Sequence, residues 1–380
     1  MIKTISLLVV CFAFFAEGLV AQKSKKKEGL VAQKSKKKAS SVSQYANART
    51  CMNVLGLFTA DSVPAMSADE AFAPLIPSTE IAPSDLPGNG LAQHPMLYVG
   101  ENCNKMFLVK DGKVIWTYST GTGPEYDDVW MLSNGNILFS RMKYVAEMTP
   151  DKKIIWRYDC SFPPGMKHTE VHACQPVGLD KVMFVVNGLP PKLIIVNTKT
   201  GKVEVEHEIP YPQPADSNSI HGQFRRARVT VAGTYLVSFL SLNCVVEYDK
   251  DFNEIWRYNI PKPWAAIRLK NGNTLITDEK EWLTREVNRK GETVWEFNCK
   301  TDLPAAYQFA SAPQTCTRLA NGNTIFTSRG QSGKGPQLIE VTRDKKVVWV
   351  LWDWKNIGDA TAVQVLDDPG VPEIPGQSEH

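Results

Sequence analysis

The chain has 380 residues, of which 43% are hydrophobic, and this apolar content is enough for one large core or two small ones. Its formal net charge is +3 at pH 7, but residues 22–38 alone hold eight lysines against one glutamate, so the rest of the chain is net negative. A net negative domain that lacks a basic stripe interleaved with aromatic residues argues against nucleic-acid binding.

The first 21 residues have the pattern of a secretory signal peptide. Lys3 supplies a basic start, residues 5–15 form an apolar run, and Ala21 is a small residue suited to cleavage. The run is too short for a transmembrane helix. We therefore predict an exported protein, periplasmic or extracellular.

Residues 22–93 are predicted to form a Lys-rich tail and a Ser/Ala/Pro-rich linker. In the tail, the lysines between Lys23 and Lys38 form either a solvated, disordered segment or an electrostatic contact with a polyanion or a membrane surface. Within the linker, residues 51–59 (CMNVLGLFT) are apolar enough to dock on the domain as a short strand or a turn of helix.

A unit of four short strands recurs along the chain. Residues 126–159, 264–298 and 314–352 each contain an Asn-Gly-Asn turn between alternating apolar residues, then a charged turn and a strand that holds a Trp. Alternation bounded by turn residues is typical of antiparallel hairpins. A four-stranded unit with a period of about 40 residues indicates the blade of a β-propeller.

Two further copies, at residues 169–209 and 220–260, are degenerate, and one more is split between the two ends of the chain. Residues 96–118 match the second, third and fourth strands of a blade, and residues 361–366 match the missing first strand. We therefore predict an all-β fold, a six-bladed β-propeller of four-stranded antiparallel blades spanning residues 94–368. It is closed by pairing of N- and C-terminal strands in one blade, which removes open sheet edges. Residues 369–380 are predicted to be a C-terminal tail.

Recurring tryptophans and scattered cysteines complete the pattern of a packed core. The tryptophans at the fourth-strand position are expected to pack between blades rather than to contact a ligand; they are Trp116, Trp156, Trp256, Trp295 and Trp349. The seven cysteines after residue 21 show neither a CxxC motif nor a tight cluster, which disfavours zinc and redox sites. Most are expected to be buried, and no disulfide is assigned.

Turn lengths indicate which face of the propeller does chemistry. The turns between first and second strands and between third and fourth strands are tight, and both kinds lie on one face. The longer connections between second and third strands, and between blades, emerge on the opposite face around the mouth of the central channel. Binding residues favour variable loops on a rigid scaffold, so we expect the functional site at that mouth.

Polar residues gather at this mouth in the predicted register, and a slip of one residue would turn a side chain away. As catalytic candidates we predict two histidines and one carboxylate, His172, His221 and Asp128; as ligand-binding candidates, Arg141, Arg226, Asp278, Arg329 and Gln223. Histidine can transfer protons near neutral pH, and arginine can bind a carboxylate or sulfate. In the alternative interpretation, Asp128 bonds strand-start amides and the arginines neutralise buried acids. No metal ligands are assigned.

The repeated NGN…W pattern resembles quinoprotein-like (PQQ-like) propeller repeats over residues 95–368. The segment VWMLSNGNILF looks like the inner strand of arylsulfotransferase-like propellers, in which a His-Asp pair heads the strand and a channel histidine accepts sulfate. Here the matching pair is Asp127-Asp128, so His172 or His221 would have to take the histidine's place. The calcium-ligand and cofactor-stacking motifs of quinone dehydrogenases are missing, so the resemblance implies no PQQ, and the metal content stays open.

Three functional hypotheses follow from these residues. The first is an exported propeller that binds an acidic carbohydrate or similar small anion at the channel mouth, with or without processing it. The second is an arylsulfotransferase-like transferase that uses a channel histidine. The third is a non-catalytic interaction scaffold with the Lys tail as an electrostatic tether. A monomer is expected in each case.

Overall fold

The computed structural model describes residues 51–58, 78, 80–100, 104–119, 125–160, 169–212, 219–330, 333–378 and 380. The predicted signal peptide, the Lys-rich tail and much of the Ser/Ala/Pro-rich linker lie outside the described residues and stay predictions. In the part of the chain that is described, no helix has both the length and the apolar character needed to span a membrane.

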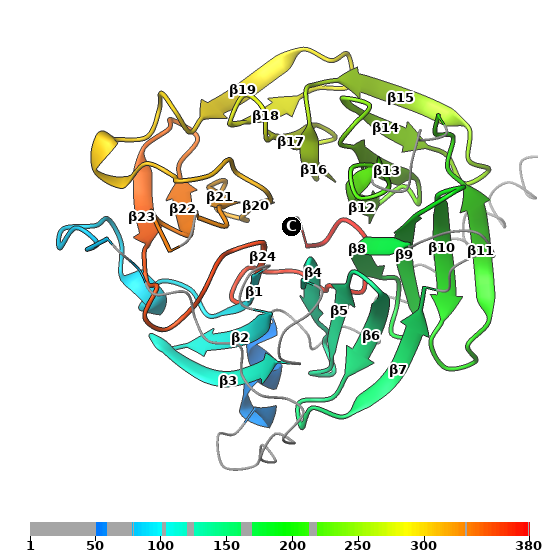
Figure 1. Cartoon of the computed structure of the whole chain (residues 1–380), viewed down its shortest axis with the longest axis horizontal. Helices are drawn as coiled ribbons and strands as arrows, with labels where there is room; N and C mark the ends of the chain where they lie inside the picture. The colour runs from blue at the N-terminus through cyan, green and yellow to red at the C-terminus, as the bar shows by residue number, and fades with distance from the viewer. Residues whose placement is uncertain are drawn as a thin grey trace, which may run out of the picture. The chain divides into compact units, whose positions relative to one another are not determined.

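Six antiparallel sheets of four strands each surround a central axis, which confirms the predicted six-bladed propeller (Figure 1). In sequence order the strands are β1 (Met96–Gly100), β2 (Lys105–Lys110), β3 (Lys113–Ser119), β4 (Asp128–Met131), β5 (Ile137–Arg141), β6 (Tyr144–Met148), β7 (Ile154–Asp159), β8 (Glu170–Pro176), β9 (Lys181–Asn187), β10 (Lys192–Asn197), β11 (Val203–Glu208), β12 (Phe224–Val229), β13 (Tyr235–Phe239), β14 (Cys244–Tyr248), β15 (Glu254–Asn259), β16 (Pro263–Arg268), β17 (Thr274–Asp278), β18 (Leu283–Val287), β19 (Thr293–Asn298), β20 (Cys316–Arg318), β21 (Thr324–Thr327), β22 (Leu338–Val341), β23 (Val347–Leu351) and β24 (Ala362–Val365). The innermost strands are β4, β8, β12, β16, β20 and β24, each at the start of its sheet (Figure 1).

Short 3₁₀ helices lie outside the blades. They are η1 (Cys51–Leu57), η4 (Gly90–Ala92) and η6 (Ala305–Tyr307). Cys51 and Leu55 of η1, with Phe58 after it, are buried in the apolar cluster that the first two blades share. The linker segment therefore docks on the propeller, as its apolar composition predicts.

The first blade joins the two ends of the domain. Strand β24 pairs antiparallel with β1, with Val363 opposite Tyr98 and Val365 opposite Met96. Because successive residues of a strand point to opposite faces, Ala362 packs toward β4 and β5 while Val363 packs toward the last blade. The predicted closure by N- and C-terminal strands is thus confirmed.

The backbone conformation and the hydrogen bonds of the Asn-Gly-Asn turns explain why this sequence recurs. Gly135, Gly272 and Gly322 all have φ near +90°, a conformation that a side chain would strain. The second Asn of each turn donates its side-chain amide to a buried glutamate on the third strand of the same blade. The pairs are Asn136–Glu147, Asn273–Glu286 and Asn323–Glu340, with distances of 2.6–2.7 Å. These bonds hold each inner hairpin in register with the outer half of its blade.

Tryptophans of the outermost strands fasten neighbouring blades, as predicted. The Trp116 indole donates to the carbonyl of Pro150 in the next blade, and Trp256 and Trp295 donate to Arg289 and Arg343 in the same way. Trp349 of the last blade donates to Gly90, just before the first blade, which extends the pattern around the closure.

Buried acid–base pairs reinforce the same interfaces. Arg268 of the fifth blade pairs with Glu247 of the fourth at 2.6 Å and stacks over Trp256. Arg318 of the sixth blade pairs with Glu286 of the fifth at 3.1 Å. At the closure the cation is a histidine: His94 contacts Glu340 at 3.0 Å and Asp367 at 3.4 Å.

His94 is expected to make ring closure pH-dependent. Burial lowers the pKa of His94, but its hydrogen bonds to Asp367 and Glu340 outweigh burial and raise the pKa to about 9. A folded-state pKa above the unfolded value of about 6.5 means that the stabilisation is complete below pH 6.5 and is lost as pH rises through 9. We expect the wild-type free energy of unfolding, measured with urea, to fall from about pH 6.5 to about pH 9.5. In His94→Gln this loss should shrink, and an equal loss in both proteins would contradict the assignment.

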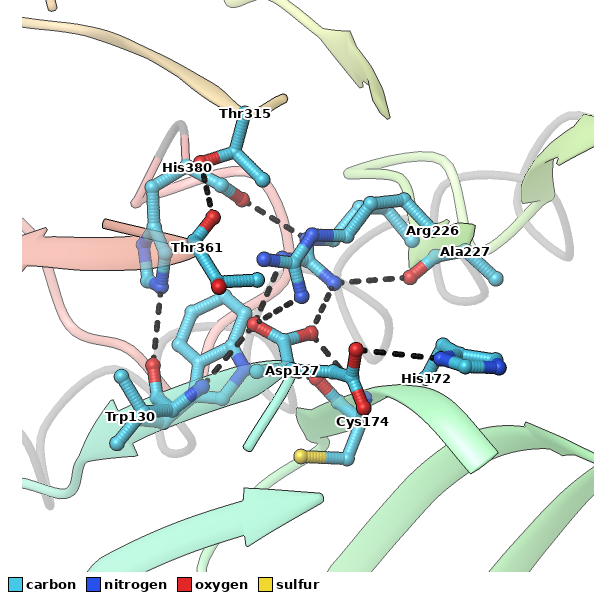
Figure 2. A network of polar contacts seen from close by, with 12 residues as sticks. Asp127, Trp130, His172, Cys174, Arg226, Ala227, Thr315, Thr361 and His380 are labelled. Atoms are coloured by element: carbon cyan, nitrogen blue, oxygen red, sulfur yellow. Dashed lines mark hydrogen bonds and ion pairs between the residues drawn. The ribbon is translucent and has the colours of Figure 1, made fainter. Parts of the chain in front are cut away.

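Residues 371–378 cross the face that carries the tight turns. The carbonyl of Glu373 accepts a hydrogen bond from Gly178, and its carboxylate accepts one from the backbone of Ser133. His380 then lies within the central channel, with its ring 3.9 Å from that of Trp130 (Figures 1 and 2). The predicted tail is therefore packed against the propeller where it is described, on the face opposite the long connections.

The described cysteines are buried, as predicted for most of them. Within the described residues they form no disulfide, and all are buried: Cys51, Cys160, Cys174, Cys244, Cys299 and Cys316.

Candidate functional site

Irregular inner strands bring the site residues together. The pairing register shifts between Val171 and Ala173 of β8, which makes His172 an extra, bulged residue. Equivalent shifts lie in β12, at residues 225–226, and in β16, at residues 264–265. All three occur near the start of an inner strand, on the face of the long connections. Bulges re-aim side chains, so three neighbouring blades each direct a bulged segment to the same mouth.

Glu170 links the two predicted catalytic histidines. Its Oε2 atom lies 2.9 Å from Nε2 of His172 and 2.8 Å from Nδ1 of His221. The rings of the two histidines are 5.2 Å apart. His172 is buried, whereas the side chain of His221 is 48% exposed. The structure thus places an accessible imidazole above a buried one, with a carboxylate between them.

Two further carboxylates lie on the other side of His172. Its Nδ1 atom is 3.2 Å from Asp127 (Figure 2) and 3.8 Å from Glu125. Both nitrogens of this buried ring therefore face carboxylate oxygens. Among the described residues, the groups Glu170–His172–His221 and Glu125–Asp127–His172 each bring their ligand atoms within 4.8 Å of one another.

Burial and charge set the protonation of this cluster. Burial would raise the pKa of Glu170, but hydrogen bonds from His172 and His221 hold the pKa well below its ordinary value. Burial and the charge of Arg225 lower the pKa of His172, against the opposing effect of Glu170. At neutral pH the cluster therefore combines an ionised Glu170 with a neutral His172.

A pocket of about 550 Å³ opens beside the cluster, on the face that the turn lengths indicate. The lining includes bases and acids, namely His221, Arg225, Lys262, Arg329, Glu125 and Glu279. The guanidinium of Arg225 lies 4.9 Å from the centre of the Trp264 ring, and this cation–π contact fixes the position of its charge. The pocket is therefore charged, with both signs on its wall.

Asp128 belongs to a separate network, which includes Arg226 and Cys174, both labelled in Figure 2. Its carboxylate pairs with Arg226 and with Arg228, each at 2.8 Å, and accepts the backbone N–H of Cys174. Burial opposes ionisation of Asp128, but the two arginines hold its pKa below the ordinary range. Arg228 also donates to the carbonyl of His380. This is the arrangement of the alternative interpretation, in which acid and arginines satisfy one another.

Three other predicted ligand-binding residues make structural contacts. Buried Arg141 donates to the hydroxyl of Tyr126 at 3.0 Å. Gln223 exchanges two hydrogen bonds with the backbone of Gly188, at 2.8 and 3.0 Å. Asp278 accepts the N–H groups of the two loop residues after Glu279, and burial raises its pKa to about 6 despite these bonds. None of the three is among the described residues that line the pocket.

Of the eight candidates, the structure therefore brings His172, His221 and Arg329 to the mouth. The additional residues there are Glu170, Arg225, Glu125 and Trp264. Glu170 and Arg225 lie within two residues of chosen candidates, but the bulges decide which side chain faces the pocket, and single residues do not signal a bulge. His380 reaches the channel from the far end of the sequence, without any pattern that could reveal it.

No family model and no curated protein sequence matches the chain. Among solved structures, it is similar to a protein of unknown function from Bacteroides caccae, with a TM-score of 0.62 and 23% identity over 72% of this chain and 98% of that one. It is also similar to a streptogramin B lyase, with a TM-score of 0.50 and 13% identity over 77% and 86% of the two chains. A catalytically inactive virginiamycin B lyase from Staphylococcus aureus, solved with quinupristin, has a TM-score of 0.50 and 14% identity over 74% and 96%. At these identities the similarity shows a shared β-propeller fold.

Proposed function

We propose that this protein binds an acidic carbohydrate or a similar small anion in the pocket at the channel mouth. The observation that carries the proposal is a pocket of about 550 Å³ in which Arg225, Arg329 and Lys262 lie beside the accessible His221. Arginine guanidinium groups bind carboxylates through paired hydrogen bonds. The pocket volume is in the range of small-ligand sites.

His221 and Glu170 give the same pocket a proton-transfer group. Glu170 accepts a hydrogen bond from Nδ1 of His221, which leaves the lone pair on Nε2. Among the described residues, Nε2 makes no hydrogen bond, and the ring lies in the pocket wall. A carboxylate that accepts a hydrogen bond from one imidazole nitrogen, and so fixes the tautomer, is typical of a histidine that acts as a general base. The proposed processing of the ligand would use this nitrogen.

The binding test compares charged with neutral sugars. Oligosaccharides of uronic acids and their neutral counterparts would be titrated calorimetrically into wild type, Arg329→Gln and the control Lys250→Gln, an exposed lysine that pairs with Asp251. We expect wild type to prefer the acidic series, Arg329→Gln to bind it about tenfold more weakly, a change of about 1.4 kcal/mol, and the control to match wild type. Equal affinity for both series, or no effect of Arg329→Gln, would refute the proposal.

A second candidate, sulfate transfer, is favoured by the same exposed nitrogen. Nε2 of His221 beside two arginines could accept sulfate from an aryl sulfate, as the arylsulfotransferase-like resemblance implies. Incubation with an aryl-sulfate donor should then release the phenol and leave sulfate on wild type, and His221→Gln should do neither. If wild type releases no phenol, this candidate fails. If the protein also binds neither series of sugars, the scaffold role, with partners at the propeller rim, remains.

A further inference from the structure

The contacts of His172 pose an electrostatic problem. A neutral imidazole carries one N–H, yet Nε2 lies 2.9 Å from Glu170 and Nδ1 lies 3.2 Å from Asp127, both buried. One of the two nitrogens must then turn its lone pair toward a carboxylate oxygen. A bound cation would remove this conflict, because it attracts both a nitrogen lone pair and a carboxylate oxygen.

The ligand atoms are arranged as such a cation requires. Glu170 Oε2 is 2.9 Å from His172 Nε2 and 2.8 Å from His221 Nδ1. With metal–ligand bonds of about 2.05 Å, adjacent ligands are about 2.9 Å apart in an octahedron and about 3.3 Å apart in a tetrahedron. These two separations match adjacent octahedral positions, and the ligand atoms of all three residues lie within 4.8 Å of one another.

We propose that Glu170, His172 and His221 form a binding site for a divalent first-row transition-metal ion. Two imidazoles and one carboxylate on one side of an octahedron are a known set for such ions, and they leave further positions open. His172 would bind through Nε2 and donate its Nδ1–H to Asp127, the usual partnership of a metal-bound histidine with a carboxylate. Both nitrogens of His172 would then face a complementary partner.

The open coordination positions can be reached from the pocket. His172 and Glu170 are buried below, whereas His221 is half exposed in the wall that also holds Arg225 and Arg329. An anion gripped by these arginines would lie beside the ion. The metal proposal does not depend on the organic ligand, because the three groups that would hold the ion all come from the protein. With the ion bound, His221 would be a ligand rather than a base.

Metal titration of the untagged protein tests the site. After chelator treatment, Mn²⁺ and Zn²⁺ would be titrated calorimetrically, with Mg²⁺ and Ca²⁺ for comparison because those ions prefer oxygen ligands. We expect one Zn²⁺ per chain, Mn²⁺ bound more weakly at the same site, and little binding of Mg²⁺ or Ca²⁺. His221→Gln, at the half-exposed ligand, should weaken Zn²⁺ binding by more than about 100-fold while leaving the melting temperature of the metal-free protein near wild type.

Three matched variants separate this site from its competitors. Asp127→Asn should weaken Zn²⁺ binding about tenfold, as for a residue that orients a ligand. Glu125→Gln should leave it unchanged, whereas a site formed by Glu125, Asp127 and His172 would lose it. Arg329→Gln should weaken sugar binding without changing metal affinity. The proposal is overturned if wild type binds Zn²⁺ no tighter than about 1 mM, or if His221→Gln binds it as wild type does.

Discussion

Val363→Asp is expected to be among the most destabilising single substitutions in the propeller, because Val363 lies on the strand that joins the two ends of the domain into a ring. Its side chain is buried at 3% exposure, in the cluster shared with Tyr98, Leu338 and Trp349. The substitution removes about 2 kcal/mol of apolar burial and places an unpaired carboxylate in an apolar site. We expect the free energy of unfolding to fall by about 4 kcal/mol or more.

The control is the same change on an outermost strand. Val294 of β19 is 45% exposed, so Val294→Asp should cost less than about 1 kcal/mol. Urea denaturation followed by tryptophan fluorescence measures both variants. If the two variants lost similar stability, burial of Val363 on the closing strand would not contribute to the stability of the ring.

Strand β24 could be recognised from sequence because closure repeats a pattern already present elsewhere. Residues 361–366 match the inner strands of other blades. Residues 96–118 supply only three strands of the first blade, and β24 pairs with β1 as the fourth. The Asn-Gly-Asn turns and the outer tryptophans are likewise determined locally, by φ near +90° and, at four of the six described interfaces, by one indole hydrogen bond. Features that are determined within a hairpin or between adjacent blades recur in the sequence of each blade and can therefore be predicted.

The site is less predictable because it depends on breaks in that repeat. Arg225 and Arg226 are neighbours, yet Arg225 reaches the pocket over Trp264 and Arg226 pairs with Asp128 in the channel. The pairing register shifts at this pair, so simple alternation along β12 does not tell which of the two arginines faces the pocket. Trp264 lies in the equivalent register shift of β16. The charged residues in the sequence predict a polar channel mouth, but the register of the backbone determines which of their side chains face it.

Asp128→Ala is expected to lower the free energy of unfolding by about 3–5 kcal/mol, because it leaves Arg226 and Arg228 buried without their shared carboxylate. The matched control is Asp251→Ala, which removes an exposed ion pair with Lys250 and should cost less than about 1 kcal/mol. Replacing Asp128, Arg226 and Arg228 together with apolar residues should restore part of the loss, since no unpaired charge then remains.

The pH dependence distinguishes this ion-pair role from a catalytic one. Since the arginines lower the folded-state pKa of Asp128, its contribution is present above the unfolded value of about 3.9 and is lost as pH falls below it. Asp128→Ala should therefore lose less stability than wild type between about pH 5 and about pH 2, in urea titrations at fixed ionic strength. A catalytic Asp128 would instead leave stability unchanged on substitution while abolishing turnover. Its complete burial and its place outside the described pocket lining favour the first outcome, in which Asp128 neutralises two buried arginines.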